Sequence, residues 1–403
     1  MPSERAETVS GGTAILLSAA AFLLYMVSGG MRCNMGLIVK ALAAHVSLSY
    51  EEVSFVAAAG QLMYGVTQPL FGLLALKRSN GTVLSAGVLL MLSGLFLTPL
   101  AASQAALLMT LSLLFFSGTG AVCFGIIMGT ISPLLGRDRA AIVSGILNAA
   151  SGVGTSLLSP LIQRLQAGVG IAATLRLLCI PVAVLLPVVF WIAAAAGKYR
   201  AAPESAAPAA GAGERLGRAL REGDYRRLMA GFATCGFHMC IIHTHIYSQI
   251  VSYGIPEETA ALAYTAFGIM TMTGSVLCGV LCRRFPLRSV LGSLYGIRAV
   301  AVAVFLFLLP KTAAAVFCFI AVLGMTGDAT VTPTSQIIAR RFGAAELGLL
   351  FGITFVCHQV GAFLSSWLGG IFISRSGNYG AIWCIDIALC ALASAVSWRI
   401  RRE

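Results

Sequence analysis

The chain has 403 residues, of which 58% are hydrophobic and only 10% charged, and its mean hydropathy is +0.90. These values exclude an ordinary soluble domain, in which about a quarter of the residues are charged. The net charge of +12 would suggest nucleic acid as a partner of a soluble protein. We predict no such partner here, because the positions of the basic residues follow the rule for membrane topology.

Six apolar runs of membrane-spanning length precede a polar segment in the middle of the chain, and six follow it. A helix that crosses a bilayer needs roughly 20 apolar residues. The first run is not typical of a cleavable signal peptide, because it is too long and no good cleavage site follows. The runs lie near residues 13–42, 50–75, 82–101, 104–134, 140–166, 172–196, 229–253, 260–282, 289–310, 313–336, 346–371 and 379–398.

The polar segment, residues 197–229, is rich in Ala, Pro and Gly in its first part, as a flexible linker is. Its second part, 214–227, is predicted to form a surface helix. We therefore expect an N-terminal six-helix half at 1–196, a cytoplasmic linker at 197–228 and a C-terminal six-helix half at 229–403.

The basic residues test this count, because cytoplasmic loops of membrane proteins carry an excess of Lys and Arg. With the N-terminus in the cytoplasm, the cytoplasmic segments hold 20 of the 27 basic residues. One span too many or too few would place all later loops on the opposite side of the membrane, and the bias would disappear. We predict a multi-pass protein of the inner (plasma) membrane, surrounded by lipid, with both termini cytoplasmic.

The two halves repeat each other at an offset of 207 residues. GILNAASGVGTSLLSP (145–160) aligns without gaps on GITFVCHQVGAFLSSW (352–367), and six positions are identical. The same offset pairs Gly72 with Gly279 and Gly136 with Gly343. Both halves run in the same direction, so the pattern indicates a parallel repeat about an axis along the membrane normal.

These features resemble the major facilitator superfamily over essentially the whole chain. The loop motif of that family after its second helix survives here only in part, as GLLALKRSNG (72–81), and GVLCRRFPLR (279–288) is equally degenerate. The fifth helix lacks the Gly-Pro signature of drug/proton antiporters and carries SGVGTSLLSP (151–160) instead. This pattern is similar to the bacterial monocarboxylate and oxalate–formate branch, although the Asp and Arg of that branch are missing from the eighth helix.

The resemblance implies an all-α membrane protein of twelve transmembrane helices, working by alternating access around one central site. Charged groups inside a membrane are costly, so each needs a reason. Arg32 lies midway along a long first helix. It either holds a substrate carboxylate in the cavity, which a guanidinium fork suits, or extends to the outer interface as an anchor.

Three histidines lie in the seventh run, in CGFHMCIIHTHIYSQ (235–249). His238 and His245 are seven residues apart and share a helix face, whereas His243 lies about 140° away from His238. In the superfamily the first and seventh helices line the cavity, which implies that Arg32 and His238 face each other. The histidines either bind an anion in a pH-dependent way or pack with satisfied hydrogen bonds. A metal site is disfavoured because no carboxylate accompanies Cys235 and His238.

Two further polar groups occupy the eleventh run. His358 and Gln359 lie near the membrane centre, in the helix where oxalate–formate transporters carry a lysine. Gln359 is predicted either to contact substrate or to pack against a neighbouring helix.

A buried ion pair is expected deeper in the C-terminal half. Arg298 in the ninth run and Asp328 in the tenth lie at similar depth, so we predict a structural pair between them, with Asp386 as the competing partner of Arg298. Direct contact of Arg298 with substrate is the alternative.

We predict a secondary active transporter of small organic anions, such as mono- or dicarboxylates, coupled to protons or to counter-anion exchange. Two embedded arginines and four membrane histidines outnumber the two embedded carboxylates, Asp328 and Asp386, which favours an anionic substrate. The alternative is efflux of drugs or other small molecules by proton antiport. The absence of a phosphate loop and of a nucleophile–base set argues against an enzyme, and we expect a monomer without metal or cofactor.

Overall fold

The computed structural model describes residues 9–198, 211–343 and 346–401. Every regular element in these ranges is a helix. The elements are α1 (Gly11–Cys33), α2 (Met35–His45), α3 (Tyr50–Lys77), α4 (Asn80–Leu97), η1 (Thr98–Leu100), α5 (Gln104–Leu107), η2 (Leu108–Phe116), α6 (Ser117–Ala121), α7 (Phe124–Leu135), α8 (Arg137–Leu177), α9 (Cys179–Ala183), α10 (Leu185–Lys198), α11 (Ala212–Arg221), α12 (Gly223–Ile241), η3 (Ile242–Ile246), α13 (Tyr247–Ser252), α14 (Glu257–Arg284), α15 (Leu287–Phe307), α16 (Ala313–Thr326), η4 (Asp328–Thr330), α17 (Val331–Phe342), α18 (Leu347–Ser376) and α19 (Gly380–Trp398).

Nine stretches among the described residues are long and apolar enough to cross a membrane. One of them, Ile142–Gly197, contains two crossings, because Gly170 has a left-handed backbone (φ 76°) that ends one helix and starts the next. Helix α3 and the segment from α12 to α13 supply the two remaining crossings. Polar residues lower the hydropathy of α3, and the segment from α12 to α13 is divided into shorter elements, so neither is among the nine stretches. The chain is a multi-pass membrane protein, and the predicted twelve-helix all-α fold is confirmed.

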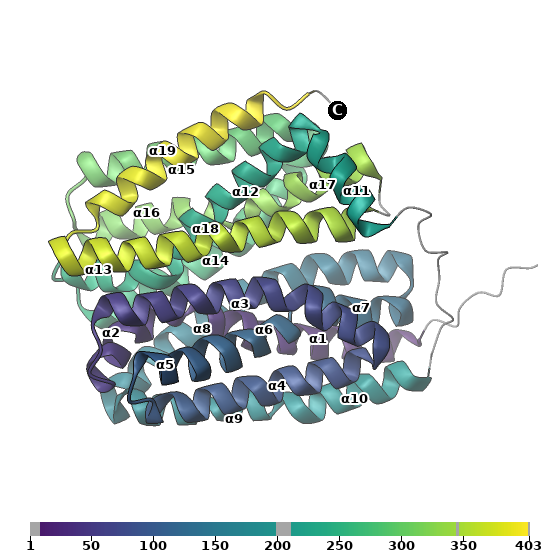
Figure 1. Cartoon of the computed structure of the whole chain (residues 1–403), viewed down its shortest axis with the longest axis horizontal. Helices are drawn as coiled ribbons and strands as arrows, with labels where there is room; N and C mark the ends of the chain where they lie inside the picture. Colours follow the sequence, from purple (N-terminus) through teal and green to yellow (C-terminus); the bar gives the residue numbers. More distant parts are fainter. Residues whose placement is uncertain (1–8, 199–210, 344–345, 402–403) are drawn as a thin grey trace, which may run out of the picture.

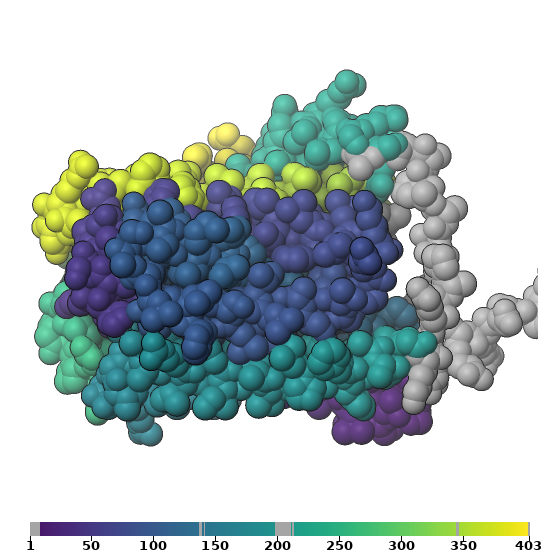
Figure 2. All heavy atoms as spheres, turned by 60° about the horizontal axis from the view of Figure 1, so that its bottom comes forward, coloured from purple at the N-terminus to yellow at the C-terminus, as the bar shows by residue number. Residues whose placement is uncertain are grey.

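The helices form two bundles that lie side by side (Figure 1). One contains α1 to α10 and the other α11 to α19. Helices α2 and α13 lie at one end of the molecule and α11 at the other, which we call the linker side. In Figure 2 the edge formed by α4, α9 and α10 comes forward, and these helices expose apolar side chains that lipid would cover: Leu89, Phe96, Ile180, Phe190 and Trp191.

The parallel repeat is confirmed by matching glycine contacts. A Cβ atom on Gly154 of α8 would lie 1.9 Å from the Met26 carbonyl oxygen of α1. A Cβ atom on Gly361 of α18 would lie 2.0 Å from the Ala233 carbonyl oxygen of α12. Both pairs are related by the offset of 207, so each half brings its first and fifth helices equally close. Small residues permit such approach within a membrane.

The same offset relates two helix ends. Gly136 after α7 and Gly343 after α17 both have positive φ values, 78° and 91°. A side chain at either position would be strained, so glycine ends both helices in the same way.

Residues 199–210 of the expected linker lie outside the described residues. Its later part forms α11, as predicted, but a break at Glu222 separates this helix from α12. Arg215 of α11 forms a two-pronged ion pair with Glu346, with N–O distances of 2.8 and 2.9 Å. This pair fixes α11 to the C-terminal half.

The two halves meet mainly where α3 packs on α18 and α8 packs on α14. The hydrogen bonds that join them run from the middle of these helices to the side opposite the linker. Tyr50 bonds His245, Ser366 donates to the Ser54 carbonyl, Tyr264 donates to the Cys33 carbonyl, Ser159 donates to the Ala261 carbonyl, and Gln359 donates to the Gln61 carbonyl. This conformation is therefore closed on the side opposite the linker.

Candidate functional site

Arg32 lies one residue before the end of α1, at the interface of the two halves. Its Nη1 donates to Gln61 Oε1 of α3 at 3.1 Å, and its guanidinium lies 4.3 Å from the centre of the Tyr64 ring. The side chain is only half-buried, and its Nε–H has no protein partner. Arg32 is thus held by uncharged groups and keeps a hydrogen-bond donor free.

The position of Arg32 follows from a break between α1 and α2. The buried Asn34 side chain donates to the Gly30 carbonyl at 2.8 Å and to the Thr155 carbonyl of α8 at 3.3 Å. This amide bonds one carbonyl at the break and one of α8, and so ties the break to the neighbouring helix. The break therefore fixes the direction of α1 at the level of Arg32.

The C-terminal half presents His358, Gln359 and Asp328 to the same place. His358 Nδ1 lies 2.7 Å from Gln359 Oε1, and Gln359 Nε2 donates to the Gln61 carbonyl at 2.7 Å. Asp328 interacts electrostatically with Arg32 and with His358. His358 and Asp328 are half-buried, like Arg32, and the cation and the carboxylate come from opposite halves and interact without a direct ion pair.

Aromatic rings surround His358 on its own side of the interface. Its imidazole stacks on Phe355, with ring centres 5.4 Å apart, and lies 4.9 Å from Phe232. Phe355 in turn contacts Tyr64 of the N-terminal half. These rings cover one side of His358 and fix the orientation of its imidazole.

Arg298 does not form the direct ion pair that the sequence predicts with Asp328. Its Nη2 donates instead to the carbonyls of Thr326 and Gly327, where α16 ends and η4 begins. These carbonyls lose their helical partners at the break and accept hydrogen bonds from the buried guanidinium, so Arg298 is held at the break and not in a direct pair with Asp328. Asp328 follows directly and faces Arg32, and Arg298 influences it only at longer range. The structure also places Arg298 inside the C-terminal half, away from the interface.

Asp386, the competing partner, bonds a histidine rather than Arg298. His238 Nδ1 lies 2.8 Å from Asp386 Oδ2, and both side chains are fully buried between α12 and α19. The expectation that His238 faces Arg32 is therefore wrong. The repeat aligns His238 with the position next to Arg32, but the packing of α12 on α19 decides where its side chain points.

His238 and His245 do not share a face, contrary to the sequence prediction. Between them lies η3, a π-helical turn, which takes more residues per turn than an α-helix and so rotates all that follows. His245 Nδ1 accepts from Tyr50 of the other half at 2.8 Å, and its Nε2 donates to the Ser366 carbonyl at 3.0 Å. His243 lies edge-on against Phe267 of α14.

Two residues of the site escaped the sequence analysis, namely Gln61 and Tyr64. Both lie in the second run, one helical turn apart, and this spacing on one helix face was the available signal. Their contact with Arg32 depends on how α1 and α3 pack.

The donor atoms of His238, Asp386 and Cys390 lie within 4.8 Å of one another. We assign this group to a hydrogen-bonded network, because Cys390 donates to Asp386 Oδ1 at 3.7 Å while His238 occupies Oδ2. The buried cation Arg298 interacts with Cys390 and would repel a metal ion there.

Two parallel six-helix bundles with a polar, charged site at their interface define a secondary transporter of the alternating-access type. The chain belongs to the Major Facilitator Superfamily, whose profile matches residues 17–251 and 228–403. The predicted superfamily is thereby confirmed, whereas the monocarboxylate and oxalate–formate branch stays a prediction.

Relatives and solved structures agree with this assignment. An uncharacterized MFS-type transporter, YcxA of Bacillus subtilis (strain 168), is 28% identical over 173 residues, which cover 42% of each chain. The crystal structure of a D-xylose-proton symporter superposes with a TM-score of 0.77 at 15% identity, covering 97% of this chain and 98% of that one. The xylose transporter XylE from E. coli, in a partially occluded inward-open conformation, gives 0.71 at 14% identity, with 98% and 99% covered.

Proposed function

We propose that this chain transports a small organic anion across the inner membrane by alternating access, coupled to protons, with the linker side cytoplasmic and the protein a monomer. The observation that carries the proposal is Arg32, a half-buried guanidinium between the halves that has a free Nε–H and only neutral partners in direct contact. A planar guanidinium binds a carboxylate through two parallel hydrogen bonds.

Asp328 gives this site a route to proton coupling. Its carboxylate interacts electrostatically with the charge of Arg32 in the other half. A substrate carboxylate that binds Arg32 would place a second negative charge beside Asp328. Two such charges are disfavoured at one site, so Asp328 would take up a proton as the anion binds. His358 and Gln359 would hold the other end of the substrate.

The remaining candidate residues take supporting roles in this proposal. Arg298 holds the break in front of Asp328, and His245 joins the halves on the closed side. His243 interacts electrostatically with Arg32 and would respond to an anion bound there.

A neutral sugar is the second candidate. The site holds the amides Gln61 and Gln359 and the Tyr64 hydroxyl, which suit sugar hydroxyls as partners. The structural neighbours named after D-xylose share the fold at 13–15% identity. Drug efflux by proton antiport would use Asp328 as its carboxylate.

Uptake into sealed vesicles by purified protein distinguishes these candidates. We would test L-lactate, oxalate and D-xylose as probes, with Arg32→Gln as the variant and Arg176→Gln, an exposed arginine, as the matched control. We expect the wild type to take up a carboxylate. Arg32→Gln should lower this uptake at least about 100-fold, because it removes one charge-assisted contact with the substrate. Saturable D-xylose uptake at the same rate in the wild type and in Arg32→Gln protein would favour the sugar. Carboxylate uptake at the wild-type rate in Arg32→Gln protein would reject the anion site.

A further inference from the structure

The second polar cluster of the chain lies inside the C-terminal half, away from the interface. His238 of α12 and Asp386 of α19 are each 0% exposed, and their Nδ1 and Oδ2 atoms are 2.8 Å apart. Cys390 donates to the other carboxylate oxygen. Burying two titratable groups costs several kcal/mol in desolvation, so the pair calls for a reason beyond packing.

His238 has one nitrogen with no partner. Because Nδ1 donates to the Asp386 carboxylate, the neutral ring carries its hydrogen on Nδ1 and a bare lone pair on Nε2. No protein atom bonds that buried Nε2 in the described part of the chain. The nitrogen is an open position for a proton.

A fixed charge interacts with Cys390, the third member of the cluster. Arg298 is fully buried, leaves Nε and Nη1 without partners, and interacts electrostatically with Cys390, Cys235 and Tyr295. With neutral His238 and ionised Asp386, the cluster including Arg298 carries no net charge. A proton on His238 gives it a charge of +1. His243 also interacts electrostatically with His238.

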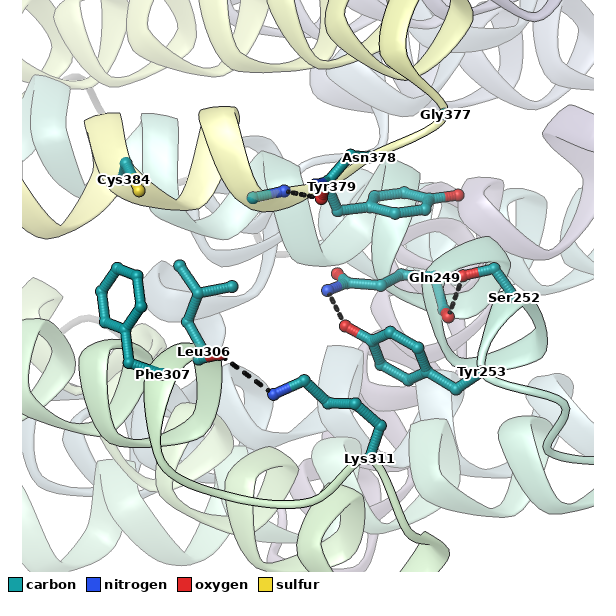
Figure 3. Close-up of a pocket in the computed structure, with 11 residues that line it drawn as sticks. Gln249, Ser252, Tyr253, Leu306, Phe307, Lys311, Gly377, Asn378, Tyr379 and Cys384 are labelled. Atoms are coloured by element: carbon teal, nitrogen blue, oxygen red, sulfur yellow. Dashed lines mark hydrogen bonds between the residues drawn. The ribbon is translucent and has the colours of Figure 1, made fainter.

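A cavity of about 530 Å³ lies in the C-terminal half, beside α13 (Figure 3). It is bordered by Gln249 in α13, Tyr253 directly after α13, Lys311 after α15, and Cys384 in α19, the helix that also holds Asp386. Cys384 precedes Asp386 by two residues, about 3 Å along the helix. Partial burial lowers the pKa of Lys311, the cation at the rim.

A short contact chain separates the cavity from His238. Tyr253 accepts from Gln249 Nε2 at 2.5 Å, and Gln249 Oε1 accepts from Trp383 Nε1 at 2.8 Å. The Trp383 ring lies edge-on to His238, with centres 6.1 Å apart. Trp383 is thus the last side chain between the cavity and the pair.

We propose that His238 and Asp386 form a proton-binding site within the C-terminal half, that this cavity supplies its protons, and that this site carries a proton of the transport cycle. A proton leaves water in the cavity and binds His238 Nε2, converting the pair to imidazolium and carboxylate. Arg298 links this event to the substrate site, because it holds the carbonyls directly before Asp328. The role in transport rests on the function proposed for Arg32 and Asp328, whereas the proton site itself does not.

The proton site is tested without substrate, on the full-length protein in lipid nanodiscs. Ring-¹⁵N NMR of histidine-labelled protein, assigned with His238→Gln, reports whether Nε2 is bare or protonated. We expect Nε2 to gain a proton as the pH falls from about 9 to about 5, and Asp386→Asn to remove this step from that range. A His238 signal that keeps one protonation state throughout in the wild type would overturn the proposal.

The cavity is tested by modification of Cys384, which lines it and is exposed. A charged methanethiosulfonate reagent on Cys384 should slow proton exchange at His238 at least about tenfold by blocking access. In Cys384→Ser protein the reagent still modifies the exposed Cys318, and proton exchange at His238 should not change. This variant therefore controls for modification outside the cavity. Unchanged exchange after complete modification of Cys384 would reject the cavity as the route.

Transport measurements then separate the two proposals. In vesicles we expect His238→Gln and Asp386→Asn to retain exchange of whichever probe the wild type accumulates among L-lactate, oxalate and D-xylose, and to lose accumulation driven by a pH gradient. Accumulation at the wild-type level in both variants would reject the coupling role. If the wild type accumulates none of the three probes, the proposed substrate class fails, and the NMR titration still decides on the proton site.

Discussion

Arg298 is fully buried, and its guanidinium donates to backbone carbonyls and not to a carboxylate. Arg298→Ala should lower stability by roughly 2–4 kcal/mol, because it leaves the carbonyls of Thr326 and Gly327 unpaired in a dry environment. Thermal unfolding of purified protein measures the loss.

The double variant of Arg298→Ala with Asp328→Asn separates the two explanations. If the ion pair suggested by the sequence held, the second change would recover most of the loss. We expect no recovery, because the damage is at the helix break. Full recovery would show that the two side chains pair directly in the membrane.

Residue identity alone located some site residues and missed others. Arg32, His358 and Asp328 stood out because a charge in a membrane helix needs a reason. Gln61 and Tyr64 are weaker signals, since such residues often pack without function. The partner of His238 could not be predicted, because Asp386 lies 148 residues further along the chain and their contact depends on how α12 and α19 pack.

Among the elements, the breaks limited prediction most. Helix number, direction and repeat follow from apolar runs and charge bias, which are coarse properties. The π-helical turn η3 and the broken segment from α16 to α17 depend on packing against neighbours, and a rule of 3.6 residues per turn cannot foresee them. The side-chain directions after each break were therefore mispredicted.

The glycines of α8 give a matched pair of variants. A Cβ atom at Gly154 would overlap the Met26 carbonyl of α1 at 1.9 Å, whereas at Gly145 it would meet nothing within 4 Å. Gly154→Ala should therefore fail to fold or lose several kcal/mol, and Gly145→Ala should gain up to about 1 kcal/mol from helix propensity. Size-exclusion profiles and thermal unfolding in detergent compare the two.

The repeat predicts the same contrast in α18. Gly361→Ala should be damaging and Gly352→Ala tolerated, because only the former approaches a neighbouring backbone. Equal stability of Gly154→Ala and the wild type would contradict the close packing of α1 on α8.

At the scale of the whole molecule, the orientation in the membrane stays a prediction from the charge bias. A background with Cys318→Ser and Cys384→Ser removes two exposed thiols. Single cysteines at Gly217 in α11 and at the exposed Ala102 then report opposite sides. In intact cells an impermeant thiol reagent should label Ala102→Cys and spare Gly217→Cys. The reverse pattern would invert the topology and place the linker outside.

Alternating access requires the contacts between the halves on the closed side to be reversible. Gly370 of α18 lies there, and a Cβ atom on it would be 2.5 Å from Ser54 Cβ of α3. Gly370→Leu should therefore act as a wedge that favours separation of the halves on this side. Gly352→Leu, in the same helix but with nothing within 4 Å, is the control for the added side chain.

The wedge is measured by the distance between spin labels on the closed side, one in each half. Ala102→Cys and Leu308→Cys are both exposed and lie at that end. In Gly370→Leu protein we expect a longer distance to gain population about tenfold, which corresponds to about 1.4 kcal/mol between the two states. Gly352→Leu should keep the wild-type distribution. A single unchanged distance in Gly370→Leu protein that remains folded would mean that α3 and α18 form a permanent contact, and the halves would then have to move about another interface.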